Sequence, residues 1–231
     1  MSLKKLVVLT GAGISAESGL KTFRDSDGLW EGYAVEEVAT YSAWLKNPAL
    51  VLDFYNQRRN AVLKAVPNEA HKILAELEQF FDVQIITQNV DDLHERAGSK
   101  KVLHLHGEIL KMRSENNDNE CFEIKNNIEI GDLAKDGFQL RPHIVWFGEP
   151  VPMMQKAIPE CMEAEIFLII GTSLVVYPAA GLVNYVAYET PVFIIDKSIP
   201  AYYNSRKIIS FEKNATEGMT ELKSLLLEKY L

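Results

Sequence analysis

A glycine-containing segment near the start of the chain has the residue types that could bind a phosphate group. Gly11-Ala12-Gly13-Ile14-Ser15-Ala16 follows a short apolar run and matches the pattern G-x-G-x-x-[GA]. The glycines of this pattern let a pyrophosphate approach backbone N–H groups at the start of a following helix. A tight glycine-rich turn can also be purely structural. The segment therefore predicts a phosphate cradle, with a structural turn as the alternative.

The residues that follow this segment argue against a dehydrogenase. In a dehydrogenase, a second strand carries an acidic residue about 20 residues further along the chain. Here that place is taken by Phe23-Arg24-Asp25-Ser26-Asp27-Gly28-Leu29-Trp30, which lacks the apolar run of a strand. We therefore keep the phosphate cradle and reject the dehydrogenase.

The other polar segments also come directly after short apolar runs, which we interpret as strands. These runs are residues 6–9, 83–86, 166–170 and 192–195, with a further one at 208–209. Nearly continuous apolar strands are typical of a parallel sheet that is covered on both faces. Ligands of such sheets bind beyond the carboxyl ends of the strands. We therefore expect the glycine segment, Gln88-Asn89, Gly171-Thr172-Ser173 and Asp196 to meet in one crevice.

Helical patterns alternate with these runs. After Pro67, apolar residues recur with the spacing of one helix face, and Gly98 is placed to end a short helix over residues 91–97. Further helices are expected over residues 178–188 and from Thr216 onwards. Strands that alternate with helices predict an α/β fold with a Rossmann-like, doubly wound parallel sheet.

Two stretches interrupt the alternation. Residues 28–66 are helical and aromatic-rich without a strand run, and residues 114–137 are polar with little periodicity. We interpret them as insertions that form a second, smaller module of helices and loops, comprising residues 28–66 and 108–140. Residues 1–27, 67–107 and 141–231 are then expected to form the Rossmann-like domain.

Composition limits the partners and the compartment. The chain of 231 residues has 24 Lys and Arg against 32 Asp and Glu, a formal charge of −8. This acidic balance argues against nucleic acid or an anionic membrane as the main partner. No apolar run approaches the roughly 20 residues of a membrane helix, and no secretory signal is expected. Two cysteines exclude a disulfide framework and favour the cytoplasm. The oligomeric state stays open.

Four motifs resemble those of the sirtuin family, the NAD-dependent protein lysine deacylases. They are residues 11–24 (GAGISAESGLKTFR), residues 87–94 (TQNVDDLH), His104-Leu105-His106-Gly107, and Gly171-Thr172-Ser173 with Tyr177-Pro178-Ala179-Ala180. They occur in the family's order and span most of the chain. The resemblance implies NAD as cofactor and acylated lysine side chains of proteins as substrate. The implied products are free lysine, nicotinamide and O-acyl-ADP-ribose.

The resemblance also assigns the NAD site. The expected cofactor contacts are Gly11, Ala12, Gly13, Ser15, Ala16, Glu17, Thr22, Phe23, Arg24, Trp30, Gln88, Asn89, Asp91, Gly171, Thr172, Ser173, Asp196 and Ala215. Without the motif, Phe23 would be interpreted as a core aromatic residue and Arg24 as a surface charge. The family often has Asn-x-Glu where this chain has Asp196-Lys197-Ser198.

His106 and Asn89 are the expected catalytic residues. A histidine titrates near neutral pH and can take a proton from a ribose hydroxyl, the role that the family implies. His71 is expected to be a surface or hydrogen-bonded residue, and His94 and His143 are expected to be structural. His104 and His106 could suggest a metal pair, but nothing nearby in the sequence completes a coordination set.

Substrate binding is expected from two segments. Residues 145–149 (VWFGE) resemble the family segment that pairs with the substrate peptide as an added strand, opposite residues 174–176. The alternative is an apolar strand packed on the sheet. The expected contacts are Val145, Trp146, Phe147, Gly148, Glu149, Val175 and Val176.

Tyr55 and Arg58 point to the acyl group. They resemble the Tyr-x-x-Arg of the sirtuin subgroup that accepts acidic acyl groups, and positions i and i+3 share one helix face. A guanidinium can hold a carboxylate bidentately. Spacing alone also allows an exposed pair, Arg58-Arg59, beside a packed tyrosine. The subgroup resemblance favours desuccinylation or demalonylation.

A departure from the family concerns zinc. Most sirtuins hold zinc with four cysteines between the His-Gly motif and the Arg-Pro-His segment, where this chain has only Cys121. Asp118, Glu120 and Glu123 with one thiol make a poor structural zinc site, so we expect no metal. Two alternative functions stay open: an NAD glycohydrolase or ADP-ribosyltransferase, and a noncatalytic reader of NAD or acyl-lysine.

Overall fold

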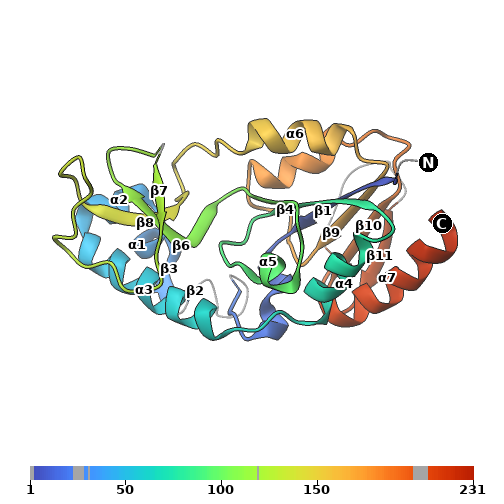
Figure 1. Cartoon of the computed structure of the whole chain (residues 1–231), viewed down its shortest axis with the longest axis horizontal. Helices are drawn as coiled ribbons and strands as arrows, with labels where there is room; N and C mark the ends of the chain where they lie inside the picture. Colours follow the sequence, from blue (N-terminus) through green and yellow to red (C-terminus); the bar gives the residue numbers. More distant parts are fainter. Residues whose placement is uncertain (1–2, 23–28, 31, 119, 200–207) are drawn as a thin grey trace.

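A computed structural model describes residues 3–22, 29–30, 32–118, 120–199 and 208–231. Two parts lie side by side along its longest axis (Figure 1). One is an α/β domain that carries both ends of the described chain, and the other is a smaller module of helices and short strands.

The large domain is built on a parallel sheet. Within the described residues it has six strands in the order β11-β10-β9-β1-β4-β5, and every adjacent pair is parallel. Along the chain, the two strands after β1, β4 and β5, extend the sheet to one side of β1, and the last three, β9, β10 and β11, extend it to the other, which is the doubly wound arrangement. The predicted fold class is confirmed. The strands are β1 (Lys5–Thr10), β4 (Asp82–Thr87), β5 (Val102–His104), β9 (Ile166–Ile170), β10 (Val192–Asp196) and β11 (Ile208–Glu212).

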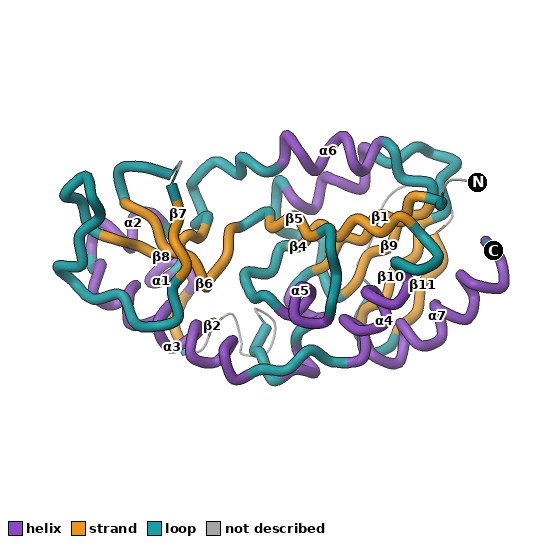
Figure 2. Tube along the Cα trace, viewed as in Figure 1, coloured by secondary structure: helices purple, strands orange, loops and turns teal. Residues whose placement is uncertain are grey.

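Helices cover both faces of this sheet (Figure 2). On one face, Leu6 and Val8 of β1 pack in the same apolar cluster as residues of α4 (Glu69–Leu77) and α7 (Ala215–Tyr230). On the other face, Val7 and Leu9 pack with α6 (Met154–Met162) and the 3-10 helix η3 (Ala179–Tyr185). All four side chains are fully buried. The apolar runs are continuous because each face of each strand meets a helical layer.

Two expected helices take a different form. The segment over residues 178–188 is the 3-10 helix η3, and the glycine segment forms two single turns, η1 (Ala12–Ile14) and η2 (Ala16–Ser18). In an α-helix the amide of Ser18 would bond to the carbonyl of Ile14. Here that carbonyl accepts a hydrogen bond from Asn68 Nδ2 at 2.7 Å, and the amide of Ser18 donates to Ser15 instead. A side chain from the start of α4 therefore replaces the helical bond.

The small module combines helices with two small antiparallel sheets. One sheet has the strand order β7-β6-β8, and β2 pairs with β3. This hairpin corrects the expectation that residues 28–66 contain no strand. The small sheet also continues to Ile144, beyond the expected boundary at residue 140. The elements of the module are α1 (Val35–Val38), α2 (Tyr41–Lys46), α3 (Pro48–Lys64), β2 (Leu29–Trp30), β3 (Tyr33–Ala34), β6 (Gly107–Ser114), β7 (Cys121–Glu123) and β8 (Leu140–Ile144). The large domain also contains α5 (Leu93–Ala97), between β4 and β5.

Buried polar side chains of α3 fasten the module. Asn56 bonds to both the N–H and the carbonyl of Ile128, at 2.9 and 3.0 Å. Arg59, which is 1% exposed, donates to the carbonyls of Ile109 at 2.9 Å and Asn126 at 3.3 Å. Burial lowers the pKa of Arg59 to about 10, so the group stays charged at neutral pH. These bonds hold the polar insertion against α3.

None of the helices in the described ranges combines the length and apolar character needed to cross a membrane.

Candidate active site

A cavity of about 670 Å³ lies between the two parts of the molecule. Its lining includes residues that follow β1, β4, β9 and β10, and residues of α3 and of the 145–149 segment. The sequence-predicted residues that line it are Gly11, Ala12, Gly13, Ser15, Ala16, Thr22, Tyr55, Arg58, Gln88, Asn89, Asp91, His106, Val145, Trp146, Phe147, Gly148, Glu149, Gly171, Thr172, Ser173, Val175, Val176, Asp196 and Ala215. The expected crevice beyond the strand ends therefore exists.

The glycine cradle is formed by two loops in backbone contact. Gly13 N–H donates to the carbonyl of Gly171 at 2.8 Å, which joins the loops after β1 and β9. A Cβ added at Gly13 would lie 2.6 Å from the Cα of Gly171, and one at Gly171 would lie 2.4 Å from the amide nitrogen of Ile14. Gly171 also has a φ of +61°. The glycines therefore have a structural role, and they keep the cavity wall free of side chains where a pyrophosphate would bind.

Three polar side chains form a chain of hydrogen bonds beside the cradle. Asn89 Nδ2 donates to Ser15 Oγ at 3.1 Å, and Ser15 Oγ donates to Asp91 Oδ2 at 3.1 Å. Burial raises the pKa of Asp91, while its bonds from Leu93 N–H and Ser15 favour the ionised form. All three line the cavity and are nearly buried. Their bonds fix their orientations before a ligand binds.

His106 is held in a state suited to accept a proton. Its Nδ1 lies 3.1 Å from the carbonyl oxygen of Gln88, which can only accept a hydrogen bond, so Nδ1 carries the ring proton. Nε2 is then the basic nitrogen. Burial lowers the pKa of His106, so the ring is neutral at physiological pH. His106 and Asn89 line the same cavity, which brings the two expected catalytic residues together.

Tyr55 and Arg58 reach this cavity from α3. Tyr55 is 1% exposed, and its ring packs 5.1 Å from that of Phe54 and 6.1 Å from that of Trp146, measured between centroids. Burial raises the pKa of Tyr55, so its hydroxyl stays protonated. Both side chains share the cavity with His106. Positions i and i+3 of α3 therefore both line this cavity.

A buried ion pair between Arg141 and Glu149 fixes the 145–149 segment. Arg141 donates to both oxygens of Glu149, at 2.7 and 3.0 Å, and its guanidinium carbon lies 3.3 Å from the ring centroid of Trp146. Glu149 Oε2 also accepts from the amide of Trp146 at 2.8 Å. Arg141 is 1% exposed. A bidentate pair of this kind fixes both distance and orientation.

One edge of the same segment is already occupied. The amide of Val145 donates to the carbonyl of His106 at 2.9 Å, and the amide of Phe147 donates to the carbonyl of Ala39 at 2.9 Å. Val175 on the facing stretch is 70% exposed. The segment is thus both packed and strand-like, so the two interpretations of its sequence are compatible.

Some expected site residues lie elsewhere. Glu17 does not line the cavity among the described residues; its carboxylate accepts from Thr216 N–H at 3.0 Å and Oγ1 at 2.6 Å, which ties η2 to the start of α7. Phe23 and Arg24 lie outside the described residues, as does the side chain of Trp30. Glu17 is therefore better explained as a structural link than as a cofactor contact.

Sequence reasoning missed a set of lining residues. Most are apolar or surface-type residues whose identity carries no chemical signal, although Tyr177 and Pro178 belong to a recognised motif. The set is Leu20, Lys21, Ala39, Val62, Val90, Ile144, Val151, Tyr177, Pro178, Ile195, Lys197, Ser198 and Lys213.

The remaining histidines do not form a metal site. His71 and His94 are fully buried, and their rings pack edge to face at 4.9 Å. Of the two alternatives for His71, the surface position is wrong and the hydrogen-bonded one holds, because its Nδ1 lies 3.0 Å from Asn68 Oδ1. In the described part of the chain, no group of three or more His, Cys, Asp or Glu could hold a metal ion. Cys121 is exposed on β7. The residues present do not fit the four-cysteine zinc site of the family.

Comparisons with known proteins agree with this geometry. The family described as the Sir2 family matches residues 11–178. An NAD-dependent protein deacylase of Helicobacter pylori is 52% identical over 226 residues, covering 98% of this chain and 99% of that protein. One of Bacteroides thetaiotaomicron is 52% identical over 231 residues, covering 97% and 99%.

Solved structures are similar over nearly the whole chain. A mutant Sir2 homologue in complex with ADP-ribose has a TM-score of 0.89 at 40% identity, covering 99% of this chain and 95% of that one. A Sir2 homologue–NAD complex has a TM-score of 0.86 at 40% identity, with 98% and 90% covered. A Sir2 protein with a p53 peptide and NAD+ has a TM-score of 0.80 at 28% identity, with 96% and 93% covered.

Proposed function

The chain belongs to the Sir2 family and is an NAD-dependent protein deacylase, and from this premise we propose that it removes succinyl or malonyl groups from lysine at least as well as acetyl groups. The observation that carries the proposal is the position of Tyr55 and Arg58 in the cavity that also holds His106 and Asn89. A carboxylate at the end of an acyl chain matches a guanidinium fork and a tyrosine hydroxyl. Lysine at position 58 could not reproduce that geometry.

We propose that the glycine cradle, Thr172 and Ser173 hold the phosphates of NAD, and that Asp196 and Ala215 lie near its adenosine end. Asn89, Ser15 and Asp91 are oriented by their mutual hydrogen bonds toward the nicotinamide ribose. When bound, NAD supplies the electrophilic ribose carbon and the group that accepts the acyl chain. Free lysine, nicotinamide and O-acyl-ADP-ribose are the proposed products.

His106 acts in this proposal as the general base. Its Nδ1–H donates to the carbonyl of Gln88, which leaves Nε2 to take a proton from a ribose hydroxyl. The lowered pKa keeps Nε2 unprotonated at neutral pH. Positioning by a hydrogen bond to the main chain prevents the ring from turning the protonated nitrogen toward the substrate.

The substrate peptide is proposed to lie as a strand between the 145–149 and 174–176 segments. The amides of Val145, Trp146 and Phe147 all bond within the chain, so we propose that the peptide pairs through the remaining main-chain groups of this segment and those of residues 174–176. The Sir2 protein solved with a p53 peptide and NAD+ supports a peptide as ligand. The two free cysteines favour a reducing compartment, and we place the enzyme in the cytoplasm.

Mass spectrometry of purified enzyme incubated with NAD and matched acetyl-, succinyl- and malonyl-lysine peptides tests the proposal. We expect the acidic peptides to be deacylated with a kcat/KM at least equal to that of the acetyl peptide, together with nicotinamide and O-acyl-ADP-ribose. Deacetylation without any activity on the acidic peptides would contradict the acyl preference. Nicotinamide release without deacylation would indicate a glycohydrolase, and binding without turnover would indicate a reader.

A further inference from the structure

The two histidines of the His-x-His motif hydrogen-bond to the carbonyl groups of two consecutive residues, Gln88 and Asn89. His106 Nδ1 lies 3.1 Å from the carbonyl oxygen of Gln88, and His104 Nδ1 lies 2.9 Å from that of Asn89. His104 ends β5, which runs parallel to β4 and pairs His104 with Thr87, and His106 lies in the turn that follows. The mechanism uses His106 and leaves His104 without a role.

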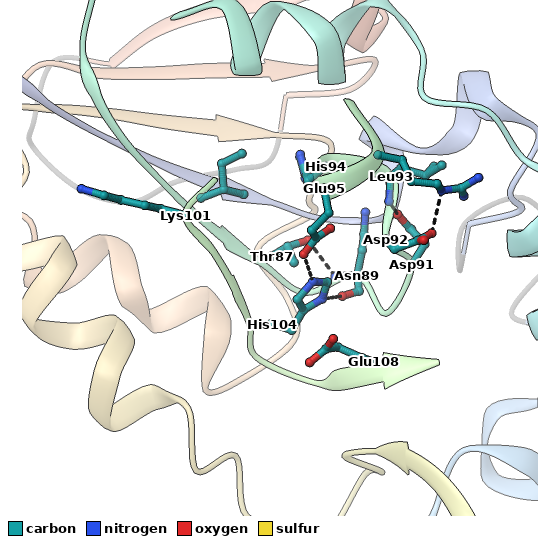
Figure 3. A network of polar contacts seen from close by, with 12 residues as sticks. Thr87, Asn89, Asp91, Asp92, Leu93, His94, Glu95, Lys101, His104 and Glu108 are labelled. Atoms are coloured by element: carbon teal, nitrogen blue, oxygen red, sulfur yellow. Dashed lines mark hydrogen bonds and ion pairs between the residues drawn. The ribbon is translucent and has the colours of Figure 1, made fainter. Parts of the chain in front are cut away.

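His104 has a second partner on its other nitrogen. Its Nε2 lies 2.8 Å from Glu95 Oε1 on α5, so the ring lies between this carboxylate and the main chain of Asn89 (Figure 3). A carbonyl oxygen and an ionised carboxylate can only accept hydrogen bonds. Both contacts are therefore satisfied only when both ring nitrogens carry protons. The ring is 8% exposed, and the geometry requires an imidazolium.

The charges around the ring agree with this state. Glu95 on α5 and Glu108 on β6 both favour the proton on His104, and together with the bond to Asn89 they raise its pKa although burial acts in the opposite direction. Glu95 in turn has a lowered pKa, through its bond to His104. Asp91 and Lys111 also face this group of charges. Burial lowers the pKa of neighbouring His94, and the charges of His71 and His104 act in the same direction.

Asn89 is fixed at three points. Its amide N–H donates to Thr87 Oγ1 at 3.0 Å, and its side chain donates to Ser15 at 3.1 Å. The third point is its carbonyl, which accepts from His104 at 2.9 Å. Among these, the bond from His104 is the one made by a charged donor, and such bonds are shorter and stronger than neutral ones.

We propose that His104 is a positioning residue for Asn89, held as an imidazolium by Glu95, and that its charge-assisted bond keeps Asn89 aimed into the NAD site. The proposal depends on the role of Asn89 proposed above. If the ring lost one proton, the remaining one would stay on Nε2 beside the stronger, charged acceptor Glu95. The lone pair of Nδ1 would then face the carbonyl of Asn89, and the bond would be lost.

Steady-state kinetics of four variants test the role. We expect His104→Leu to lower kcat/KM for NAD by roughly 10- to 100-fold, the scale of a small misplacement of a reacting group. His104→Asn should recover most of this loss, because its amide can donate to the carbonyl of Asn89 from the place of Nδ1. Glu76→Gln is the matched control: it breaks a half-exposed ion pair with Lys223 on the far helices and should leave activity unchanged. Asn89→Ala should be nearly inactive.

Nitrogen-15 NMR of the ring provides a readout that packing alone would not change. At pH 7 we expect both ring nitrogens of His104 to carry protons in the parent enzyme, and the proton count to fall to one at a lower pH in Glu95→Gln. A singly protonated ring in the parent, or equal defects in His104→Leu and His104→Asn, would overturn the proposal. Full activity of Asn89→Ala would overturn the assignment of Asn89 and this proposal with it. An inactive Asn89→Ala beside a fully active His104→Leu would overturn the positioning role alone.

Discussion

The large domain and the small module are each stabilised by a different kind of internal contact, although both line the same cavity. In the large domain, a parallel sheet is buried between two apolar layers, and its central strand contributes fully buried side chains to both. In the small module, the apolar cluster is joined to its loops by a few buried polar side chains, Asn56, Arg59 and Arg141. The stabilising contacts are thus spread over many apolar residues in the large domain, whereas in the small module a few buried polar residues provide much of the stabilisation. The proposed base and NAD cradle belong to the first part, the proposed acyl contacts Tyr55 and Arg58 belong to the second, and the proposed peptide segment 145–149 follows directly after β8 of the second.

The largest effect should come from the base and should leave both parts folded. We expect His106→Ala to lower turnover by roughly 10²- to 10⁴-fold, the usual contribution of general-base catalysis. NAD affinity, measured by calorimetry, and the free energy of unfolding should change little, because the lost bond to Gln88 is a single hydrogen bond at the edge of the cavity. Activity within a few fold of the parent enzyme would remove His106 from the mechanism.

Breaking the Arg141–Glu149 pair should show the difference between the two parts most clearly, because it should destabilise the small module and leave the large domain unaffected. Arg141→Met leaves Glu149 largely buried without its bidentate partner, and the expected loss in the free energy of unfolding is about 3–5 kcal/mol. Hydrogen exchange should accelerate in β6 and β8 and not in β1 or β9. Arg113→Met is the matched control, because Arg113 approaches the same carboxylate only to 3.9 Å and its loss leaves the bidentate bond from Arg141 in place, so it should cost much less than Arg141→Met. Equal losses in the free energy of unfolding from both variants would contradict the view that a few buried polar residues stabilise the small module.

Acid should act on the large domain first. Burial lowers the pKa of His71 to about 4, against about 6.5 in the unfolded chain. Between these values the unfolded chain binds a proton that the folded chain excludes. Stability is therefore complete above pH 6.5 and falls as the pH drops, by about 3 kcal/mol at pH 4.

Unfolding in urea at several pH values checks this expectation. His71→Phe removes the titrating group and should reduce the slope of stability against pH between 6.5 and 4. The parent and the variant would show identical slopes if His71 were protonated in the folded state.

The acyl preference tests whether the small module selects the substrate. Arg58→Met should lose about 1.5–3 kcal/mol in kcat/KM on succinyl- and malonyl-lysine peptides, the usual contribution of a charge-assisted hydrogen bond, and little on acetyl-lysine. Arg58→Lys keeps the charge but lacks the planar fork, so it should recover only part of the loss. Equal losses on all three acyl groups would assign Tyr55 and Arg58 a structural role.

The smallest expected effect concerns zinc. Since hydrogen bonds from Asn56 and Arg59 fasten the polar insertion, chelation should leave the Tm unchanged, and elemental analysis of tag-free protein should find no stoichiometric zinc. One equivalent of zinc per chain would overturn this prediction.

The sequence predicts the large domain better than the small module, for a physical reason. Continuous apolar runs such as residues 166–170 indicate strands buried on both faces, and their order along the chain limits the topology. The buried partners of Arg59 and Arg141 leave no such periodic signal, because each bond depends on a chain segment that is distant in sequence or turned back on itself. The same limit explains Glu17: its motif suggests a ligand, whereas its carboxylate meets Thr216 at the other end of the chain.

The site residues that belong to the recognised motifs could be predicted from the sequence. Most expected contacts line one cavity, from Gly11 to Ala215. Apolar wall residues such as Val62 could not be predicted, because nothing in their type distinguishes a cavity wall from a core. The role of His104 also depends on the position of Glu95, which sequence alone does not give.

The strand order has a consequence for the order of events during synthesis. β1 lies between β4 and β9 in the finished sheet, so one of its two hydrogen-bonding edges is completed by a strand that leaves the ribosome only after the entire small module. Until then the nascent chain can pair β1, β4 and β5 on one side while the other edge stays exposed. An exposed apolar edge invites pairing with other chains. The small module is therefore able to fold first, and the half of the cradle that contains Gly171 is assembled last.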